Sequence, residues 1–350
     1  MSLNEATSES EAIRLATYPP PYPDSWYVVC RSEEVTDKPL NVTALGRRFV
    51  VFRDEAGQAA VLDAHCPHMG ADMSLGRVVD GSIECPFHQW RFGADGCLAA
   101  PPYGQEKTPK VKARTWPVDE AYGLILIYFS TKPNTPPPYP FPRYEAVEEG
   151  RMTRRGKHDP KPVKMHLIEF AENSVDFQHF APIHGKMVFP WTQVPIPSVR
   201  IHHDATWEPD PDEAHVAWFR NNAVLEIFGR VREWSRTTAA IRFIGPGGVV
   251  AFTFDVPDRG RILMFHTHTP LGPMSQKVRF TWFADKRIPS LLASYIVGSW
   301  VSQWQGDIEI WENKVYRTKP MLNPEDGPVR ELRSWFSQFY PSEATAELPT

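Results

Sequence analysis

Residues 63–96 read DAHCPHMGADMSLGRVVDGSIECPFHQWRFGADG and contain two short segments that each offer one thiolate and one imidazole. The first segment pairs Cys66 with His68, and the second pairs Cys85 with His88. Each cysteine is followed by proline, and five glycines are distributed around the two pairs, a composition typical of tight loops. Two such loops, presenting four ligand side chains, predict a metal centre.

The spacing of these ligands favours iron over zinc. A structural zinc site usually begins with cysteines about two to four residues apart and ends with histidines about three to five apart. Here each loop mixes one cysteine with one histidine, with one residue between them in the first loop and two in the second. A Rieske cluster binds one iron through two thiolates and the other through two imidazoles. We therefore interpret the segment as a two-iron, two-sulfur site, with zinc or metal-free turns as the alternatives.

This segment resembles the Rieske domain of Rieske-type non-haem iron oxygenases, and the run Cys-Pro-Phe-His-Gln-Trp at 85–90 is similar to the second loop of that family. Rieske proteins of membrane complexes carry an additional cysteine in each loop. This chain has Met69 and Phe87 near those places. The resemblance therefore points to the soluble, oxygenase-type branch.

Length and composition are those of an ordinary globular protein with room for two domains: 350 residues, 42% hydrophobic and 23% charged. A formal net charge of -4 gives no electrostatic basis for binding nucleic acid. Residues 1–16 lack the basic start and apolar run of a signal peptide, and no apolar segment reaches the roughly eighteen residues of a membrane span. We expect a cytoplasmic location.

Two features leave alternatives open. Cys30 and Cys97 are expected as free thiols in a reducing compartment, although a disulfide between them is compatible with the sequence. The longest apolar stretch, residues 288–304, is interpreted first as a buried helix, with peripheral contact to a membrane as the second interpretation.

Proline-rich runs at 18–23 and 135–142 divide the chain. Short strands between them (26–30, 47–52, 59–63, 82–84 and 123–129) predict a small antiparallel sandwich. We expect four parts: a flexible N-terminus at 1–17, a Rieske two-iron two-sulfur domain at 18–134, a proline-rich linker at 135–160 and a catalytic non-haem iron domain at 161–345.

The pattern after the linker predicts a helix at 166–179, followed by strands at 223–231, 240–244, 249–256, 261–268 and 277–284. A long helix at about 290–316 and a final helix at 327–340 come next. The expected class is α+β, an all-β Rieske domain followed by a helix-grip (START-like) domain whose strands surround a long helix and an apolar cavity. Taken alone, this second pattern equally suits a lipid-binding module.

The expected helix at 166–179 carries candidate ligands for a second metal. Asp176 and His179 are three residues apart and share a helix face, with Asn173 one turn earlier. His184 follows beyond Pro182, which turns the chain and lets both imidazoles reach one metal. Two histidines and one carboxylate form the facial triad of iron(II) enzymes that activate oxygen.

Asp307 is our choice for the carboxylate, with Glu309 and then Glu312 as alternatives. Asp176 is assigned instead as the outer partner that orients His179. Asn173, Phe180 and Met187 are candidate pocket residues, with packing in the core as the first interpretation for Phe180 and Met187.

The order Asp176-x-x-His179-x-x-x-x-His184 also resembles the iron-ligand motif of the oxygenase family, and Asp307 falls where that family places its carboxylate. The resemblance implies a head-to-tail homotrimer in which His88 of one chain passes an electron through Asp176 of the next chain to His179. It also implies O2 as co-substrate and a reductase or ferredoxin as electron donor. The chain has no Gly-x-Gly-x-x-Gly after a strand, so NAD(P)H and flavin are expected only on the partner reductase.

Segments 63–68, 172–180, 307–314 and 333–340 look more like sterol and steroid oxygenases than aromatic-ring dioxygenases. The similar groups are the ketosteroid 9α-hydroxylases, the cholesterol 7-desaturases and the bacterial sterol C-4 demethylases. The resemblance implies a terminal monooxygenase component that hydroxylates, desaturates or oxidises a methyl of a sterol or steroid. The alternatives are ring hydroxylation or O/N-demethylation of an aromatic or other non-steroid substrate and, more distantly, lipid binding or electron transfer alone. Animal desaturases carry an N-terminal anchor that this sequence does not show, so a soluble bacterial enzyme is expected.

Overall fold

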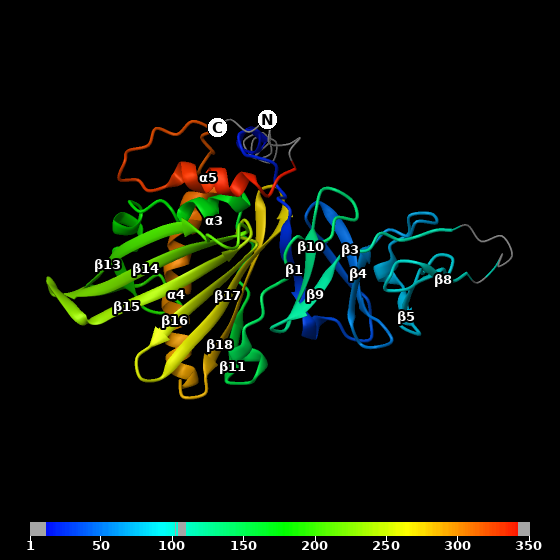
Figure 1. Ribbon diagram of the computed structural model, residues 1–350, viewed down its shortest axis with the longest axis horizontal. Coiled ribbons are helices and arrows are strands. Elements are labelled where there is room, and N and C mark those ends of the chain that lie inside the picture. The colour runs from blue at the N-terminus through cyan, green and yellow to red at the C-terminus, as the bar shows by residue number, and fades with distance from the viewer. Residues whose placement is uncertain (1–11, 102, 104–109, 342–350) are drawn as a thin grey trace. The chain divides into compact units, whose positions relative to one another are not determined.

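The computed structural model describes residues 12–101, 103 and 110–341. These residues form two compact units, one of residues 24–142 and the other of the residues on either side of them (Figure 1). The smaller unit is all-β apart from short turns of helix, and the larger unit combines one large sheet with a few helices. The expected two-domain α+β class is confirmed.

The smaller unit contains three antiparallel sheets. The first sheet has strand β10 (Leu124–Phe129) at its centre. This strand is the apolar run LILIYF, and all six of its side chains are buried. The sheets are ordered β1 (Ser25–Arg31), β10, β9 (Val118–Ala121); β2 (Leu40–Ala44), β3 (Arg47–Arg53), β4 (Ala59–Asp63); and β5 (Arg77–Val79), β6 (Ser82–Glu84), β7 (Arg91–Phe92), β8 (Leu98–Ala100). The third sheet flanks the second Cys/His segment, because that segment connects β6 to β7.

Each proline-rich run is fastened by a buried tyrosine. Tyr139 lies in the smaller unit, where its carbonyl accepts a hydrogen bond from Trp26 Nε1 at 3.0 Å. Tyr18 lies in the larger unit, where its hydroxyl donates to the buried carboxylate of Glu169 at 2.5 Å. Residues 18–23 therefore pack within the larger unit, and residues 135–142 pack within the smaller unit.

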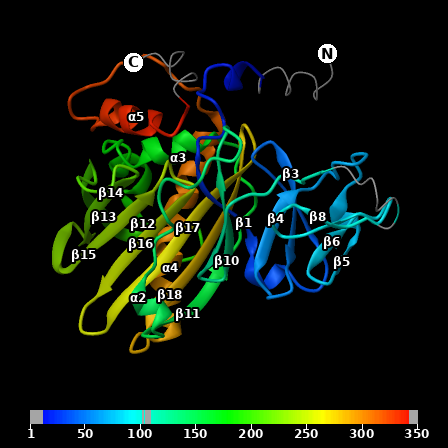
Figure 2. The ribbon, with the colours of Figure 1, turned by 45° about the vertical axis from the view of Figure 1, so that its right-hand side comes forward.

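The larger unit is built on one antiparallel sheet of eight strands, drawn in green to yellow in Figures 1 and 2. Helix α4 (Ser290–Asn313) lies across one face and contacts both edge strands, β11 and β12, so the sheet curls around the helix. The order is β11 (Met152–His158), β18 (Ser275–Asp285), β17 (Gly260–Gly272), β16 (Val249–Val256), β15 (Arg230–Ile244), β14 (Val216–Ile227), β13 (Pro195–Pro209), β12 (Lys186–Val188). This is the expected helix-grip arrangement.

Helix α4 is a core helix. Val297, Val301, Trp304 and Trp311 recur at intervals of three to seven residues and are buried against the sheet. In the described part of the chain, no helix is both long enough and apolar enough to cross a membrane.

The larger unit also contains the short helices α2 (Glu145–Glu148), α3 (Leu167–Asn173) and α5 (Val329–Ser337). The buried side chains of Glu169 and Glu172 on α3 accept hydrogen bonds from Lys314 Nζ and Arg333 Nε, both at 2.6 Å. These bonds connect α3 to α5 and to the segment that follows α4.

The structure differs from the expected elements in two places that bear on function. Helix α3 ends at Asn173 rather than at residue 179, because the Phe177 amide leaves the helical pattern and donates to the carbonyl of Asp326 at 3.0 Å. The expected strand 223–231 is interrupted by a turn at Phe228 and Gly229 that joins β14 to β15. Polar residues alternate along β13 and the first half of β15, so the sequence pattern did not predict those strands.

Candidate functional site

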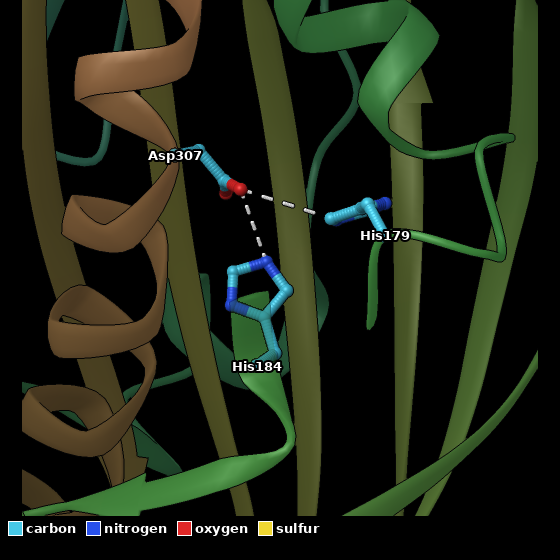
Figure 3. A group of neighbouring side chains, drawn as sticks. All are labelled: His179, His184 and Asp307. Atoms are coloured by element: carbon cyan, nitrogen blue, oxygen red, sulfur yellow. Dashed lines mark ion pairs between the residues drawn. The ribbon is translucent and has the colours of Figure 1, made fainter. Parts of the chain in front are cut away.

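The larger unit brings the side chains of His179, His184 and Asp307 together at one point (Figure 3). His184 Nε2 lies 3.1 Å from Asp307 Oδ1, and His179 Nε2 lies 4.0 Å from the same oxygen. All three potential ligand atoms are within 4.8 Å of one another. Adjacent ligands on one metal ion are separated by roughly 3 Å when each metal–ligand bond is about 2.1 Å, so the three atoms need only small movements to share an ion.

The chain after α3 orients the first imidazole. The main-chain carbonyl of Asp176 accepts a hydrogen bond from Nδ1–H of His179. The Asp176 carboxylate accepts a second one from the main-chain N–H of His179, at 3.3 Å. The proton on Nδ1 leaves the lone pair of Nε2 directed toward Asp307. Asp176 thus orients His179 through its carbonyl, while its carboxylate holds the turn.

The second imidazole is oriented from helix α4. Residues Phe180–His184 form a single π-helical turn that contains Pro182 and brings His184 back toward the helix. The Nδ1 atom of His184 lies 3.1 Å from Gln303 Oε1. The sequence analysis missed Gln303, although its position four residues before Asp307 on one helix places both side chains on the same face.

Asn173, the last residue of α3, contacts two members of the group. Its Nδ2 lies 3.2 Å from Asp307 Oδ2 and 3.2 Å from His179 Nε2. The hydrogen bond to Oδ2 holds the carboxylate so that Oδ1 faces the two imidazoles. This donor set, two neutral nitrogens and one carboxylate oxygen, fits a divalent first-row metal with positions left open.

The geometry also distinguishes among the three candidate carboxylates. Asp307 is 5% exposed and points into the group. Glu309 is exposed, and the Glu312 carboxylate accepts the main-chain N–H of Lys164 at 3.0 Å. Among the three, only Asp307 lies with both histidines.

A cavity of about 310 Å³ reaches this group. This volume is at the small end of the range of roughly 300–1,000 Å³ for small-molecule sites. Asn173, His184 and Asp307 line its inner end, and the candidate pocket residues Phe180 and Met187 contribute to its wall. Most of the remaining wall is apolar and includes Phe219, Ile241, Phe243, Phe252, Trp300 and Trp304.

His203 is a polar residue of the cavity wall that the sequence did not indicate. His203 on β13 stacks on Phe180, and its Nδ1 lies 2.9 Å from Asn221 Nδ2. Burial lowers the pKa of His203 to about 4, so the ring is neutral, and its Nε2 is buried beside the His184 backbone. When Nδ1 accepts a hydrogen bond from Asn221, the proton of the neutral ring lies at Nε2. Side chains alternate along β13, so the neighbouring His202 points outward and contacts Glu226. This alternation could not identify His203 from the sequence, because β13 was not among the predicted strands.

The two Cys/His segments of the smaller unit fold into matching loops. In each loop the cysteine amide donates to the carbonyl five residues later, and the cysteine carbonyl accepts the amide four residues later. The residues in that fourth position, Gly70 and Gln89, both have positive φ, at 76° and 60°. The paired residues are Cys66 with Gly70 and Ala71, and Cys85 with Gln89 and Trp90.

The four side chains are sorted into a buried thiol pair and a partly exposed imidazole pair. Burial, together with interaction with the Cys85 thiol, raises the pKa of Cys66 to about 11, so a pair of thiolates here requires a compensating cation. The rings of His68 and His88 lie 4.7 Å apart between centroids, and His68 also stacks on Trp90 at 4.3 Å. Two thiols at one end and two imidazoles at the other fit a two-iron cluster with unlike ligands. No disulfide joins Cys30 and Cys97.

Comparison with protein families gives two matches along the chain. Residues 25–116 match the Rieske [2Fe-2S] domain, and residues 127–340 match the 3-ketosteroid 9alpha-hydroxylase C-terminal domain. Together these matches include all seven of the side chains described above as potential metal ligands.

Individual proteins are similar over nearly the whole chain. A cholesterol 7-desaturase of Caenorhabditis elegans is 31% identical over 93% of this chain and 79% of its own length. A probable 3-ketosteroid-9-alpha-monooxygenase oxygenase component of Rhodococcus rhodochrous is 29% identical over 97% of this chain and 85% of its own. The structure of apo dicamba monooxygenase superposes with a TM-score of 0.65 at 19% identity, covering 92% of this chain and 98% of that chain, a similarity of fold.

Replacing Gln303 tests the orientation of His184. We expect Gln303→Leu to weaken iron(II) binding at the three-residue group by about 10- to 100-fold, because the ring loses the partner that fixes its tautomer. Competition with a chelator measures this affinity. The matched control is Gln305→Leu on the same helix, whose side chain contacts Gln193 instead. Equal iron affinity in both variants would show that His184 needs no support from Gln303.

Proposed function

Because the chain belongs to the Rieske-type non-haem iron oxygenases, we propose that it is a terminal oxygenase component that oxidises a sterol or steroid with O2. Electrons would come from NAD(P)H through a separate reductase or ferredoxin. The observation that carries the proposal is one apolar cavity that ends on a two-histidine, one-carboxylate group. The steroid-related names of the similar proteins support the class of substrate.

The ligand assignments follow from the two groups of side chains. His179, His184 and Asp307 would hold the mononuclear iron(II), and Cys66, His68, Cys85 and His88 would hold the [2Fe-2S] cluster. When bound, the iron supplies oxygen activation and the cluster supplies single electrons.

The other residues of the site position the metal ligands and exclude water. Asn173 holds Asp307 through Oδ2, and Gln303 and the Asp176 carbonyl keep the two ring Nε2 atoms aimed at the metal position. The aromatic wall excludes water from the reacting centre. His203 Nε2–H is placed to donate a hydrogen bond to a hydroxyl or keto oxygen of the substrate.

Electron delivery would require a second copy of the chain. In the proposed head-to-tail homotrimer, His88 of one chain meets the Asp176 carboxylate of the next. Asp176 is half-buried beside His179, and the His88 ring is partly exposed, so both are accessible for such a contact. A carboxylate that accepts two N–H bonds holds both groups and shortens the path of the electron.

Iron content tests the ligand assignment. We expect Asp307→Ala to lower the iron content from about three to about two atoms per chain, because the cluster retains its two irons and the mononuclear site loses its only anionic ligand. Metal analysis and the visible absorption of the cluster measure the two sites separately. Glu309→Ala is the matched control and should retain about three. The reverse result would identify Glu309 as the ligand.

Substitution of Asp176 tests the route of the electron. We expect Asp176→Asn to keep both metal sites filled and to slow reoxidation of the reduced cluster at least about ten-fold, because an amide cannot accept at both of its ends. Stopped-flow absorbance of pre-reduced enzyme mixed with O2 and substrate follows the reoxidation. Asp212→Asn, an exposed change in the same unit, serves as the control. Wild-type reoxidation in Asp176→Asn would remove the bridging role.

Turnover of a substrate panel tests the proposed function. With a surrogate reductase, NADH and isotopically labelled O2, we expect sterols or steroids to be oxidised and aromatic acids to be left unchanged, because the cavity wall is mainly apolar. Mass spectrometry of the products distinguishes hydroxylation, desaturation and methyl oxidation. Turnover of aromatic acids without any sterol would contradict the substrate class.

A further inference from the structure

The β14–β15 hairpin extends beyond the neighbouring strand β16. Strand β15 pairs with β16 only over residues 239–244, whereas its pairing with β14 continues to Ile227 and Arg230. Residues 223–238 therefore form a projecting hairpin, here called the tongue, which is visible between the labels β14 and β15 and the edge of the view in Figure 1. One edge of the tongue is covered by β13.

The apex of the tongue is an aromatic residue in an unfavourable conformation. Phe228 and Gly229 form the two-residue turn, with φ of 50° and 73°. Such turns favour Asn or Gly at both positions, because a bulky side chain is disfavoured at positive φ. Phe228 is 78% exposed, so its ring gains no buried contact in return. A strained, exposed aromatic residue indicates a contact outside the chain.

A bulge presents a second aromatic residue. The pairing of β14 with β15 shifts between Ala223 and Leu225, and Ser235 stabilises the extra residues. Its Oγ accepts the Leu225 N–H at 2.9 Å and donates to the Arg232 carbonyl at 2.6 Å. Trp234, inside this bulge, is 78% exposed, and Val231 is 49% exposed.

The charges beside these apolar side chains are unbalanced. Glu226 pairs with His202, and Glu233 pairs with Arg236. Arg230 and Arg232 have no ion-pair partner within the described residues. The chain as a whole carries a formal net charge of -4, so this basic pair at the apex contrasts with the protein's average charge.

The tongue adjoins the mouth of the cavity. The cavity runs from the buried ligand group to an end lined by the exposed side chains of Thr237, Thr238 and Tyr295. Thr237 follows Trp234 by three residues on β15, a distance of about 10 Å along an extended chain. The exposed apolar apex and the opening of the apolar cavity thus lie on one continuous segment.

We propose that the tongue docks on the surface of an anionic lipid bilayer. Phe228 and Trp234 insert among the acyl chains, and Arg230 and Arg232 bind lipid phosphates. Contact with a second copy through a two-fold axis would instead bring the arginines of both copies together, which is unfavourable. An apolar substrate would then pass between the bilayer and the cavity mouth. This role in substrate transfer rests on the proposed function, whereas the docking itself is independent of it.

Flotation with vesicles tests the docking. We expect the holoenzyme to bind vesicles of phosphatidylcholine and phosphatidylglycerol, and binding to fall at least ten-fold in Phe228→Asn/Trp234→Ser and in Arg230→Gln/Arg232→Gln. Met321→Ser and Arg330→Gln, exposed changes elsewhere in the larger unit, should bind as wild type. Phe228→Asn alone should keep or raise the melting temperature while weakening binding, because asparagine tolerates positive φ.

Three results would overturn the proposal: wild-type enzyme that floats with neither anionic nor neutral vesicles, tongue variants that bind as strongly as wild type, or tongue variants whose mass by light scattering changes without lipid. The last result would assign the tongue to contact between copies. Because flotation requires no turnover, an enzyme that binds vesicles but oxidises no sterol would contradict the proposed function and leave the docking surface intact.

Discussion

The catalytic unit depends on placing one carboxylate, that of Asp307, in an apolar interior. A buried carboxylate is costly unless a cation or hydrogen-bond donors balance its charge, and in this structure its neighbours are two imidazoles and the amide of Asn173. Three separate segments meet at this carboxylate: α4 supplies the carboxylate itself, the end of α3 supplies the amide, and the turn at 180–184 supplies an imidazole. The sheet that curls around α4 keeps the group dry, which strengthens every electrostatic interaction within it.

In both units, hydrogen bonds orient the side chains that we propose as metal ligands. In the smaller unit, each loop fixes its ligands by hydrogen bonds that start and end on the cysteine backbone. In the larger unit, each imidazole is fixed by a partner on its Nδ1 atom, a carbonyl for His179 and an amide oxygen for His184. In both cases these hydrogen bonds fix the direction of the proposed ligand atoms, which reduces the ordering that metal binding would have to provide.

The sequence was sufficient for features that are local. Both Cys/His loops, the spacing from Asp176 to His184 and the long helix α4 could be predicted, because ligand chemistry and helix periodicity depend on neighbouring residues. Gln303, His203 and the early end of α3 could not, because each depends on a partner distant in the sequence: His184, Asn221 and Asp326. The tongue could not be predicted for a different reason. Phe228 occupies a turn position for which sequence rules expect asparagine or glycine, so the turn was read as a continuous strand.

The position of His203 constrains how a substrate would lie. Its ring is 6.4 Å from that of His184, so the one imidazole donor in the apolar wall stands beside the metal ligands rather than at the mouth. A substrate oxygen bonded to Nε2 would hold the oxygen-bearing end of the molecule near the metal, and the hydrocarbon end would extend toward Thr237 and Tyr295. A hydrogen bond at Nε2 would fix the direction of the substrate and tolerate small shifts along the mainly apolar cavity. The carbon that reacts would therefore be selected by its distance from that oxygen, together with the shape of the wall and its other polar side chains, such as Ser299 and Thr238.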